Sequence, residues 1–346
     1  MWQGKRENTG DMRCIQRVGP DYLDMRTFCI YNVICRGRSL RMPFLRIFKA
    51  PLREKSTGIR QKETGKAMKF TKMHGCGNDY VYVNCFEEQI RDPAALSVKI
   101  SDRHFSVFSD GLILIGPSDI ADFSMDIYNA DGSRAMMCGN GIRCVGKYVY
   151  DKGLTDHTRI TVETRSGIKT LELKTENGKV NRVLVDMGSP ILEPSLIPMK
   201  SGLEKVIGEP VQAAGREWTM TCLSMGNPHC VVPVETVNDL KLEEIGPAFE
   251  WLDIFPERVN TEFIHVDSQD HVTMRVWERG SGETFACGTG ACAAAVACML
   301  NGWTGDQVTV SLRGGDLQIT WDRLKNTVFM EGEAVISFEG CIETED

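Results

Sequence analysis

Two cysteines stand in matching sequence motifs whose chemistry suits proton transfer. Cys138 begins the sequence Cys-Gly-Asn-Gly, and Cys287 begins the sequence Cys-Gly-Thr-Gly. A thiol can donate a proton and its thiolate can accept one, so each motif offers an acid or a base. If the two thiols lie on opposite faces of one carbon atom, one removes a proton and the other returns a proton from the opposite side. Such a pair would invert a carbon centre.

Other residues share the spacing of the two cysteines, which lie 149 residues apart (287 − 138). The same offset relates Asn78 to Asn227, each preceded by glycine, and relates Asn129 to Glu278. Matches at a single offset indicate a duplicated unit. We therefore expect two similar halves that face each other across a cleft, with one cysteine from each half.

A helix is expected directly after each cysteine motif. The helix-favouring segments are residues 141–150 and 291–300, and the second is almost wholly apolar, which is typical of a helix enclosed within a domain. The free N–H groups of a first helical turn attract a carboxylate. The positive end of the helix also lowers the pKa of a thiol. Each motif thus predicts a carboxylate cradle beside a thiol that ionises readily.

Short β-strands are expected around these helices from Met68 onward. The strand-like segments are 79–84, 126–128, 159–163, 183–186, 230–234, 263–266 and 271–276. The predicted fold class is α+β, with two pseudo-symmetric domains, each a mainly antiparallel sheet wrapped around a central helix. The active site is expected in the cleft between them.

The predicted domains are residues 68–187 and 188–334, with the last strand, about 335–346, able to return to the first domain. Residues 1–67 form a basic N-terminal extension outside the core, with 15 Lys and Arg against 6 Asp and Glu. A targeting peptide, a nucleic-acid-binding arm and sequence upstream of the native start all remain open for it. The whole chain has a net charge of −7, so the remainder is acidic, which argues against a nucleic-acid partner for it.

The composition indicates the compartment in which the protein is expected and which kinds of site it is expected to lack. The chain has 13 cysteines and no evident signal peptide, so a reducing cytoplasm is expected and a disulfide framework is not. No apolar run approaches the roughly 20 residues of a membrane-spanning helix. Zinc binding by Cys138 with Cys144, or by Cys287 with Cys292, is an alternative, but their spacings are not those of a zinc ribbon. A purely structural role for Cys138 and Cys287 is a second alternative. We expect no metal.

Several stretches of the chain resemble the diaminopimelate epimerase family. The resemblance begins at Met68 and runs nearly to the C-terminus. The stretches are residues 72–80 (Lys-Met-His-Gly-Cys-Gly-Asn-Asp-Tyr), 128–133 (Tyr-Asn-Ala-Asp-Gly-Ser), 137–144 (Met-Cys-Gly-Asn-Gly-Ile-Arg-Cys), 224–231 (Ser-Met-Gly-Asn-Pro-His-Cys-Val), 256–260 (Pro-Glu-Arg-Val-Asn) and 278–291 (Glu-Arg-Gly-Ser-Gly-Glu-Thr-Phe-Ala-Cys-Gly-Thr-Gly-Ala). The resemblance implies an isomerase that interconverts LL- and meso-2,6-diaminopimelate without a cofactor, in lysine and peptidoglycan precursor biosynthesis.

The resemblance also implies a role for individual residues. Cys138 and Cys287 match the catalytic acid–base pair, and His229 and Glu278 match positions that tune the two thiols. The positions that match substrate-binding residues are Asn78, Asn129, Gly139, Asn140, Asn227, Asn260, Glu278, Arg279, Gly288 and Thr289. Arg279 is the expected partner of the distal carboxylate, since Arg binds a carboxylate through two parallel hydrogen bonds. The expected partner is this small molecule, with no nucleic acid or membrane, and a homodimer is expected in the cytoplasm.

One loop departs from the family pattern. Where the family usually has Gly-x-Gly-x-Asp-Gly, this chain has Ser106-Val-Phe108-Ser-Asp110-Gly111. If either lost glycine had positive φ, its replacement would be strained by roughly 1 kcal/mol or more. Two alternative functions remain open: a proline or hydroxyproline racemase of the same architecture, and a non-catalytic amino-acid-binding protein.

Overall fold

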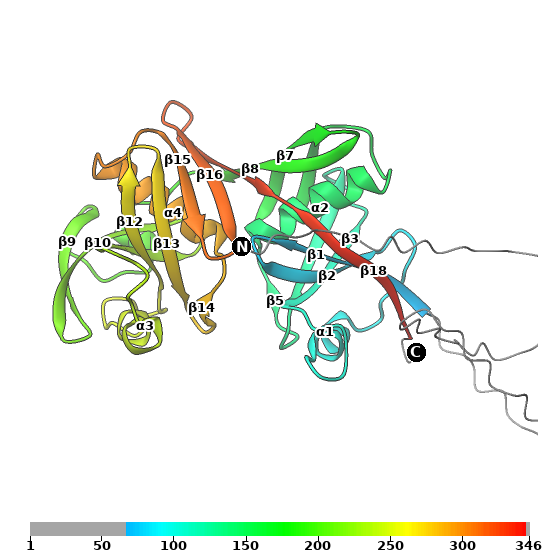
Figure 1. Ribbon diagram of the computed structural model, residues 1–346, viewed down its shortest axis with the longest axis horizontal. Helices are drawn as coiled ribbons and strands as arrows, with labels where there is room; N and C mark the ends of the chain where they lie inside the picture. Colours follow the sequence, from blue (N-terminus) through cyan, green and yellow to red (C-terminus); the bar gives the residue numbers. More distant parts are fainter. Residues whose placement is uncertain (1–66, 344–346) are drawn as a thin grey trace, which may run out of the picture. The chain divides into compact units, whose positions relative to one another are not determined.

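The structure, a computed structural model, describes residues 67–343. The predicted N-terminal extension therefore lies outside the described residues, apart from Ala67. The first half of the described chain contains β1 (Ala67–Gly75), β2 (Asn78–Asn84), α1 (Pro93–Ser101), β3 (Gly111–Gly116), β4 (Phe123–Asn129), β5 (Arg134–Ala135), α2 (Gly139–Asp151), β6 (Arg159–Thr164), β7 (Gly167–Glu176) and β8 (Lys179–Gly188) (Figure 1).

The second half repeats this plan. It contains the short 3-10 helix η1 (Pro194–Leu196), β9 (Val206–Ala213), β10 (Arg216–Ser224), β11 (Pro228–Pro233), α3 (Leu242–Glu250), β12 (Asn260–Ser268), β13 (His271–Glu278), β14 (Gly282–Thr284), α4 (Gly288–Leu300), β15 (Gln307–Leu312), β16 (Gly315–Asp322), β17 (Thr327–Glu333) and β18 (Val335–Glu343). The fold is thus α+β and dominated by strands, as the sequence predicted.

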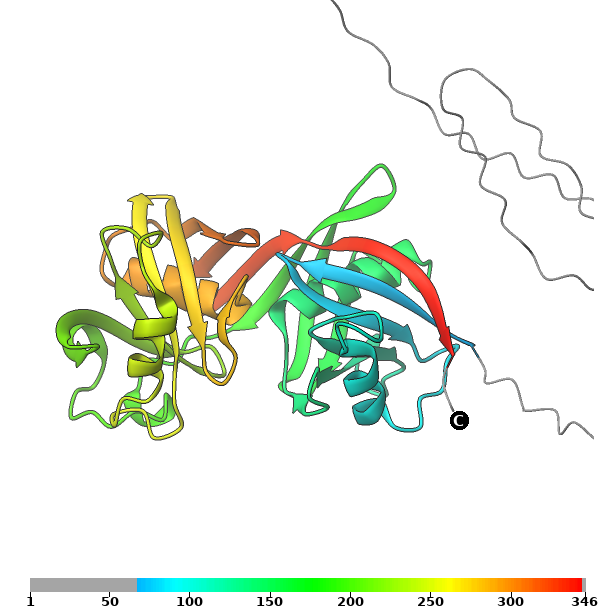
Figure 2. The ribbon, with the colours of Figure 1, turned by 60° about the horizontal axis from the view of Figure 1, so that its bottom comes forward.

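Strand pairing connects the two halves at two places. β8 of the first half pairs antiparallel with β17 of the second, with Val185 opposite Met330. β18, the last strand, pairs antiparallel with β1, with Phe70 opposite Gly340, and Figure 2 shows it alongside the first two strands. The end of the chain therefore completes the sheet of the first half.

The strand register repeats at the offset of 149 residues. Val81 on β2 lies opposite Leu112 on β3, and the positions 149 residues later, Cys230 and Thr261, are paired in the same parallel sense. Among residues 67–343 most pairings are antiparallel, and the four parallel ones are β2 with β3, β4 with β6, β11 with β12 and β13 with β15. The duplication inferred from a few short motifs thus extends to the backbone pairing.

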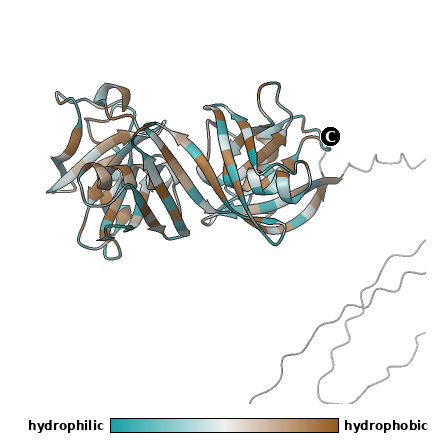
Figure 3. Ribbon diagram, turned by 90° about the horizontal axis from the view of Figure 1, so that it is seen from above, coloured by the Kyte–Doolittle hydropathy of each residue, from teal (hydrophilic) through white to brown (hydrophobic). Residues whose placement is uncertain are grey.

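Each half encloses one helix, α2 or α4, within its strands (Figure 1). α4 is buried along almost its whole length, from Gly288 to Met299, as its apolar sequence predicted. Hydrophobic and hydrophilic bands alternate along many strands in Figure 3, which is the pattern of a strand with one face on a core. The helices begin at Gly139 and Gly288, a few residues earlier than predicted, so that each cysteine becomes the N-cap of its helix.

Candidate active site

Cys138 is held at the N-cap of α2 by its extended backbone, with φ −133° and ψ 116°. Its sulfur accepts a hydrogen bond from the N–H of Gly141 at 3.3 Å and donates one to Oδ1 of Asn78 at 3.3 Å. Asn78 stands at the start of β2, far from Cys138 in sequence. The fold therefore brings together a predicted catalytic thiol and a predicted substrate-binding amide.

Cys287 occupies the corresponding N-cap of α4, with φ −121° and ψ 111°. Its sulfur lies 3.5 Å from Oγ1 of Thr289, in the first turn of the helix. Cys287 is buried, whereas Cys138 is half-buried. The two thiols thus have the same backbone position but different neighbours.

The N-termini of α2 and α4 meet between the two halves. A Cβ on Gly139 would lie 3.6 Å from Cα of Gly288, an ordinary van der Waals contact, and 3.0 Å from Cε of Met330, so the two helix ends are close neighbours. Asn140 on α2 donates from Nδ2 to the carbonyl oxygen of Ala286 at 3.2 Å, which connects the halves directly. The first-turn N–H groups of both helices therefore lie near each other, as a shared carboxylate cradle requires.

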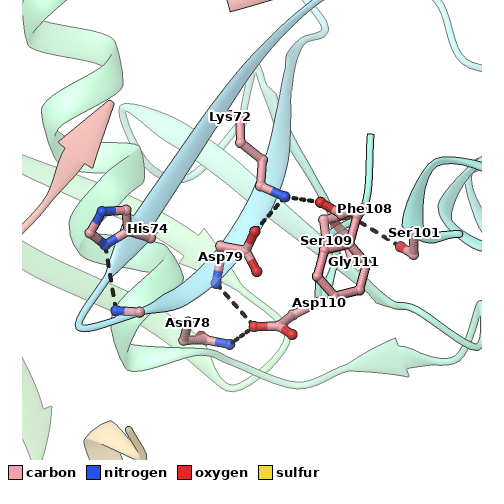
Figure 4. A network of polar contacts seen from close by, with 10 residues as sticks. Lys72, His74, Asn78, Asp79, Ser101, Phe108, Ser109, Asp110 and Gly111 are labelled. Carbon is pink, nitrogen blue, oxygen red and sulfur yellow. Dashed lines mark hydrogen bonds and ion pairs between the residues drawn. The ribbon is translucent and has the colours of Figure 1, made fainter. Parts of the chain in front are cut away.

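Asp110 fixes the side chain of Asn78. Its Oδ2 accepts hydrogen bonds from Nδ2 of Asn78 at 2.7 Å and from the backbone N–H of Asp79 at 3.0 Å (Figure 4). Because Nδ2 is bound to Asp110, Oδ1 of Asn78 is directed to Cys138. Burial, the largest cause, raises the pKa of Asp110 above its usual range. The Asp-Gly pair of the altered loop thus supports the Cys138 site.

His229, on β11, is fully buried beside the Cys287 half of the site. Its Nδ1 lies 2.8 Å from Oε1 of Glu262, and its Nε2 lies 2.9 Å from Oδ1 of Asn227. The predicted residues His229 and Asn227 are therefore in direct contact. Glu262, which the sequence did not point to, binds the other nitrogen of the His229 ring, so that the ring lies between Glu262 and Asn227.

Glu278 stands at the end of β13 and approaches Cys287. Thr284 donates from Oγ1 to Oε1 of Glu278 at 2.5 Å. Burial raises the pKa of Glu278, although hydrogen bonds from Thr284 and Cys287 oppose the shift. Each of the two groups therefore affects the pKa of the other, as a tuning role requires.

Asn260 and Arg279 are joined through the backbone. Asn260 accepts a hydrogen bond at Oδ1 from the N–H of Arg279 at 3.0 Å and donates from Nδ2 to the carbonyl of Pro228 at 2.9 Å. Nη1 of Arg279 donates to the carbonyl of Glu257 at 2.9 Å, and no ion pair of this guanidinium is found within residues 67–343. The Asn260 side chain positions neighbouring backbone, while the charge of Arg279 stays available for an anion.

Asn129 stands at the end of β4. Its N–H donates to the carbonyl of Ser133 at 2.8 Å, and its Nδ2 donates to Oγ of Ser133 at 3.0 Å. These bonds close a turn. The structure therefore gives Asn129 a local role, and its role toward substrate stays a prediction.

The prediction that both thiols have a lowered pKa was wrong for the net shift. Burial raises the pKa of Cys138 and raises that of Cys287 further, well above the usual range. The N–H groups of Gly141 and Asn140 do lower the pKa of Cys138, as expected for a helix N-terminus, but desolvation outweighs them. For Cys287 the nearby Glu278 and Glu262 add to the rise.

Arg143 is a second residue whose importance the sequence analysis missed. It is fully buried below the first turn of α2, where Nη1 donates to the carbonyl of Gly139 at 3.1 Å and Nη2 donates to Oδ1 of Asn140 at 3.0 Å. Its positive charge lowers the pKa of Cys138. A lone Arg in a helix that faces a core was the available signal, because such a charge is buried only where it makes specific bonds.

The altered loop keeps its place in the site. Phe108 has φ 60°, so the second lost glycine does use the left-handed region, whereas Ser106 is not among the described residues with positive φ. The carbonyl of Phe108 accepts a hydrogen bond from the buried Lys72, which also pairs with Asp79 (Figure 4). The ring of Phe108 is about half exposed. The strain predicted for this loop therefore falls on Phe108 alone.

Comparison with known proteins agrees with this geometry. A sequence profile described as "Diaminopimelate epimerase" matches residues 70–193 and 221–337. The chain belongs to the diaminopimelate epimerase family. It is 59% identical over 283 residues to the diaminopimelate epimerase of Agathobacter rectalis, an alignment that covers 80% of this chain and 99% of that protein. It is 55% identical over 276 residues to that of Acetivibrio thermocellus, with the same coverage of each chain.

Solved structures share the fold of this family member at low sequence identity. A hydroxyproline epimerase from Agrobacterium vitis aligns with a TM-score of 0.61 and 13% identity over 81% of this chain and 92% of that chain. A PhzF-family phenazine biosynthesis protein from Bacillus anthracis aligns with a TM-score of 0.59 and 17% identity over 80% of this chain and 99% of that chain. These similarities support the two-repeat fold. They do not identify the substrate, which depends on the residues of the site.

Two further findings concern alternatives raised by the sequence. Within residues 67–343 there is no group of three or more His, Cys, Asp or Glu residues arranged to hold a metal ion. None of the helices in the same part of the chain combines the length and the apolar character that crossing a membrane takes.

Proposed function

We propose that this protein interconverts LL- and meso-2,6-diaminopimelate by a two-base mechanism, with Cys138 and Cys287 as the acid and the base. The observation that carries the proposal is that both cysteines are N-caps of helices whose first residues meet, Gly139 and Gly288. A carboxylate bound there would have a thiol at each of two helix ends. Membership of the diaminopimelate epimerase family supports the choice of substrate.

The helix ends supply most of the required stabilisation. Removing the α-proton places negative charge on the substrate carboxylate, which is where the N–H groups of both first turns point. Fixed donors that need no reorganisation lower the barrier more than mobile water does. We propose that these groups, with the exclusion of water and the fixed positions of two thiols, replace an electron-withdrawing cofactor. No cofactor is part of the proposal.

The two thiols begin the reaction in different protonation states. Cys138 accepts N–H bonds and lies near the positive charge of Arg143, whereas Cys287 has the carboxylates of Glu278 and Glu262 nearby. Cys138 therefore loses its proton more easily. We propose that its thiolate removes the α-proton of the LL isomer while the thiol of Cys287 donates a proton to the other face.

The amides and Arg279 bind the remainder of the substrate. Diaminopimelate has two ammonium and two carboxylate groups, and an Asn side chain offers donors and an acceptor without net charge. Asn78, Asn227 and Asn129 are proposed to hold the polar groups near the reacting carbon. Arg279, whose guanidinium makes one bond to a backbone carbonyl, is proposed to bind the distal carboxylate. Proline has no second carboxylate, which disfavours a proline substrate.

The location and the assembly are also proposals. The ten cysteines found between residues 67 and 343 are free thiols, which agrees with a reducing cytoplasm. A homodimer is supported by β18, which pairs with β1 alone in the described chain and exposes about half of Phe338. Sedimentation analysis distinguishes a dimer from a monomer directly.

The test of the function is conversion of pure LL-diaminopimelate, followed by chiral chromatography under reducing conditions. The proposal predicts the meso isomer at equilibrium from either direction, and no racemisation of L-proline or trans-4-hydroxy-L-proline at the same enzyme concentration. Conversion of proline without conversion of diaminopimelate would contradict it, and binding of diaminopimelate without conversion would favour a binding protein.

A further inference from the structure

Glu262 is a buried carboxylate that neither the motifs nor the family resemblance identified. It lies on β12 and is fully buried. Its Oε1 contacts Nδ1 of His229 at 2.8 Å, while its Oε2 has no hydrogen-bond partner in the part of the chain that the structure describes. Burying a carboxylate with one free oxygen destabilises the fold unless a positive or polar partner compensates. A buried carboxylate such as Glu262 is therefore expected to have a specific structural or functional role.

The position of Glu262 is below the first turn of α4. A Cβ on Gly290 would lie 2.7 Å from Oε1 of Glu262 and 3.3 Å from Sγ of Cys287. The carboxylate oxygen of Glu262 and the sulfur of Cys287 therefore both lie beside the same position, next to Gly290. At such separations in a dry interior, a charge acts strongly on its neighbour.

The matching position in the other half holds no carboxylate. Ile113, 149 residues earlier, occupies it: a Cβ on Gly141 would lie 2.7 Å from Cδ1 of Ile113 and 3.4 Å from Cβ of Cys138. Ile113 is fully buried, like Glu262. The same backbone position thus holds an aliphatic side chain beneath one cysteine and a carboxylate beneath the other.

We propose that Glu262 is a positioning residue that holds the His229 ring through Nδ1 and keeps the sulfur of Cys287 protonated in the free protein. The role in catalysis rests on the proposed function, in which Cys287 begins as the acid. The titratable groups that face Cys287 are Glu262 from β12, Glu278 from β13 and, through Glu262, the ring of His229 from β11. Both carboxylates oppose ionisation of the thiol.

The experiment compares how fast a thiolate-specific reagent modifies the two cysteines. Wild-type protein and Glu262→Gln, without substrate at pH 8, are treated briefly with iodoacetamide, and peptide mass spectrometry gives the ratio of modified Cys287 to modified Cys138. Loss of the Glu262 charge is expected to raise this ratio about tenfold, the effect of one pKa unit on the thiolate fraction. Cys138 serves as the reference within each sample. An unchanged ratio would overturn the proposal.

A matched control separates the charge of Glu262 from general loss of a buried carboxylate. Glu331 on β17 is also buried, and it pairs with Lys174 and Arg182. Glu331→Gln removes the same charge elsewhere in the fold, and its ratio should equal that of wild type. Glu262→Asp keeps the charge, so its ratio should stay within about twofold of wild type. A tenfold rise in either control would contradict a charge effect specific to Glu262.

A second measurement needs no variant. If Glu262→Gln does not fold, ¹⁵N NMR of the wild-type protein reports whether Nδ1 of His229 carries a proton, as a bond to the Glu262 carboxylate requires. An Nδ1 without a proton would overturn the positioning role. Neither measurement uses substrate, so each is independent of the conversion assay. An active epimerase with an unchanged ratio disproves only the role of Glu262, and an inactive protein with the shifted ratio disproves only the function.

Discussion

The two cysteine sites have the same backbone and different charged neighbours. Around Cys138 the matched positions are occupied by Tyr80, Ile113 and Asn129, which carry no charge at neutral pH. Around Cys287 the positions 149 residues later are occupied by His229, Glu262 and Glu278. The two halves therefore share the helix N-terminus at the cysteine and differ in the side chains beneath it.

The difference shows how a symmetric fold can perform an asymmetric task. A two-base inversion needs one thiolate and one thiol at the start, yet two identical sites would ionise together. Burial raises the pKa of both thiols, the carboxylates beside Cys287 raise its pKa further, and Arg143 opposes the rise at Cys138. In the proposed mechanism, the charged residues of the second half assign the starting roles of the two thiols.

The largest expected effect comes from removing either thiol. Cys138→Ser and Cys287→Ser should each lower kcat for epimerisation on the order of 10³-fold, because a hydroxyl is a far weaker acid and base than a thiol at neutral pH. Cys144 is a buried thiol nearly two turns further along α2, and Cys144→Ser should retain activity if it folds. Activity that survives in either catalytic variant would show that the reaction needs only one of the two sites.

The comparison is sharpened by making the second site resemble the first. Glu278→Asn places at Cys287 the residue that stands at the matched position near Cys138. The charge of Glu278 raises the pKa of Cys287, so its loss should lower that pKa and move the high-pH fall in kcat/KM to lower pH. We expect kcat/KM at the optimum to drop about a hundredfold. A high-pH limb that stays in place would contradict the electrostatic difference between the sites.

The pH profile of the wild-type enzyme follows from the same shifts. Burial raises the pKa of both thiols from the usual value of 9.0, and raises that of Cys287 further. A raised pKa means that thiolate appears only at higher pH, so kcat/KM should increase from pH 7 toward pH 9 as Cys138 ionises. It should fall again only where Cys287 loses its proton. A profile that is flat or declines from pH 7 to 9 would contradict this order.

Substitution of Arg279 should have a smaller effect, and it tests the binding of the substrate. Arg279→Lys keeps the charge but loses the paired hydrogen bonds to a carboxylate, so KM should rise about tenfold with little change in kcat. Arg216→Lys, in β10, changes an Arg that stacks on Trp218, and its KM should not change. If Arg279→Lys lowers kcat and leaves KM unaltered, Arg279 acts on the chemical step and not on the distal carboxylate.

The smallest expected effect concerns the altered loop. Phe108 has φ 60°, so Phe108→Gly should relieve strain of about 1 kcal/mol. Contacts of the ring with Lys72 and Arg103, at 5.9 and 5.7 Å from the ring centre, offset part of that gain. Phe108→Ala loses the ring and keeps the strain, so it should be the least stable of the three. Thermal unfolding that ranks Gly below Ala would contradict the strain at this position.

The sequence predicted a helix directly after each cysteine motif, because glycine spacing and apolar runs are local signals. It placed the start of each helix a few residues too late, so the N-cap position of each cysteine came only from the structure. It did not predict the hairpin of β9 and β10, or the short helices α1 and α3, because no motif or strong periodicity marks them. Glu262 and Arg143 were missed for a different reason. Each is a charged residue within an otherwise ordinary segment, and only the packing of strands β11 and β12, or the first turn of α2, shows what it contacts.

The direction of the net pKa shift of the two thiols also could not be predicted from the local sequence. The helix N-terminus acts in the expected direction, but the amount of burial depends on how the two halves close over the site. Burial is the largest cause for both Cys138 and Cys287. A motif gives the sign of one contribution, and the tertiary structure decides the sum.

The measurement that tests the central claim most directly is the isotope content of early reaction mixtures in heavy water. LL-diaminopimelate is incubated with reduced protein in D₂O, and substrate and product are separated before a tenth of the substrate has reacted. Two separate thiols predict deuterium at one α-carbon of the meso product and none in the recovered LL isomer. Deuterium in the recovered substrate at a similar level would show that a single base serves both faces, and would contradict the two-site account.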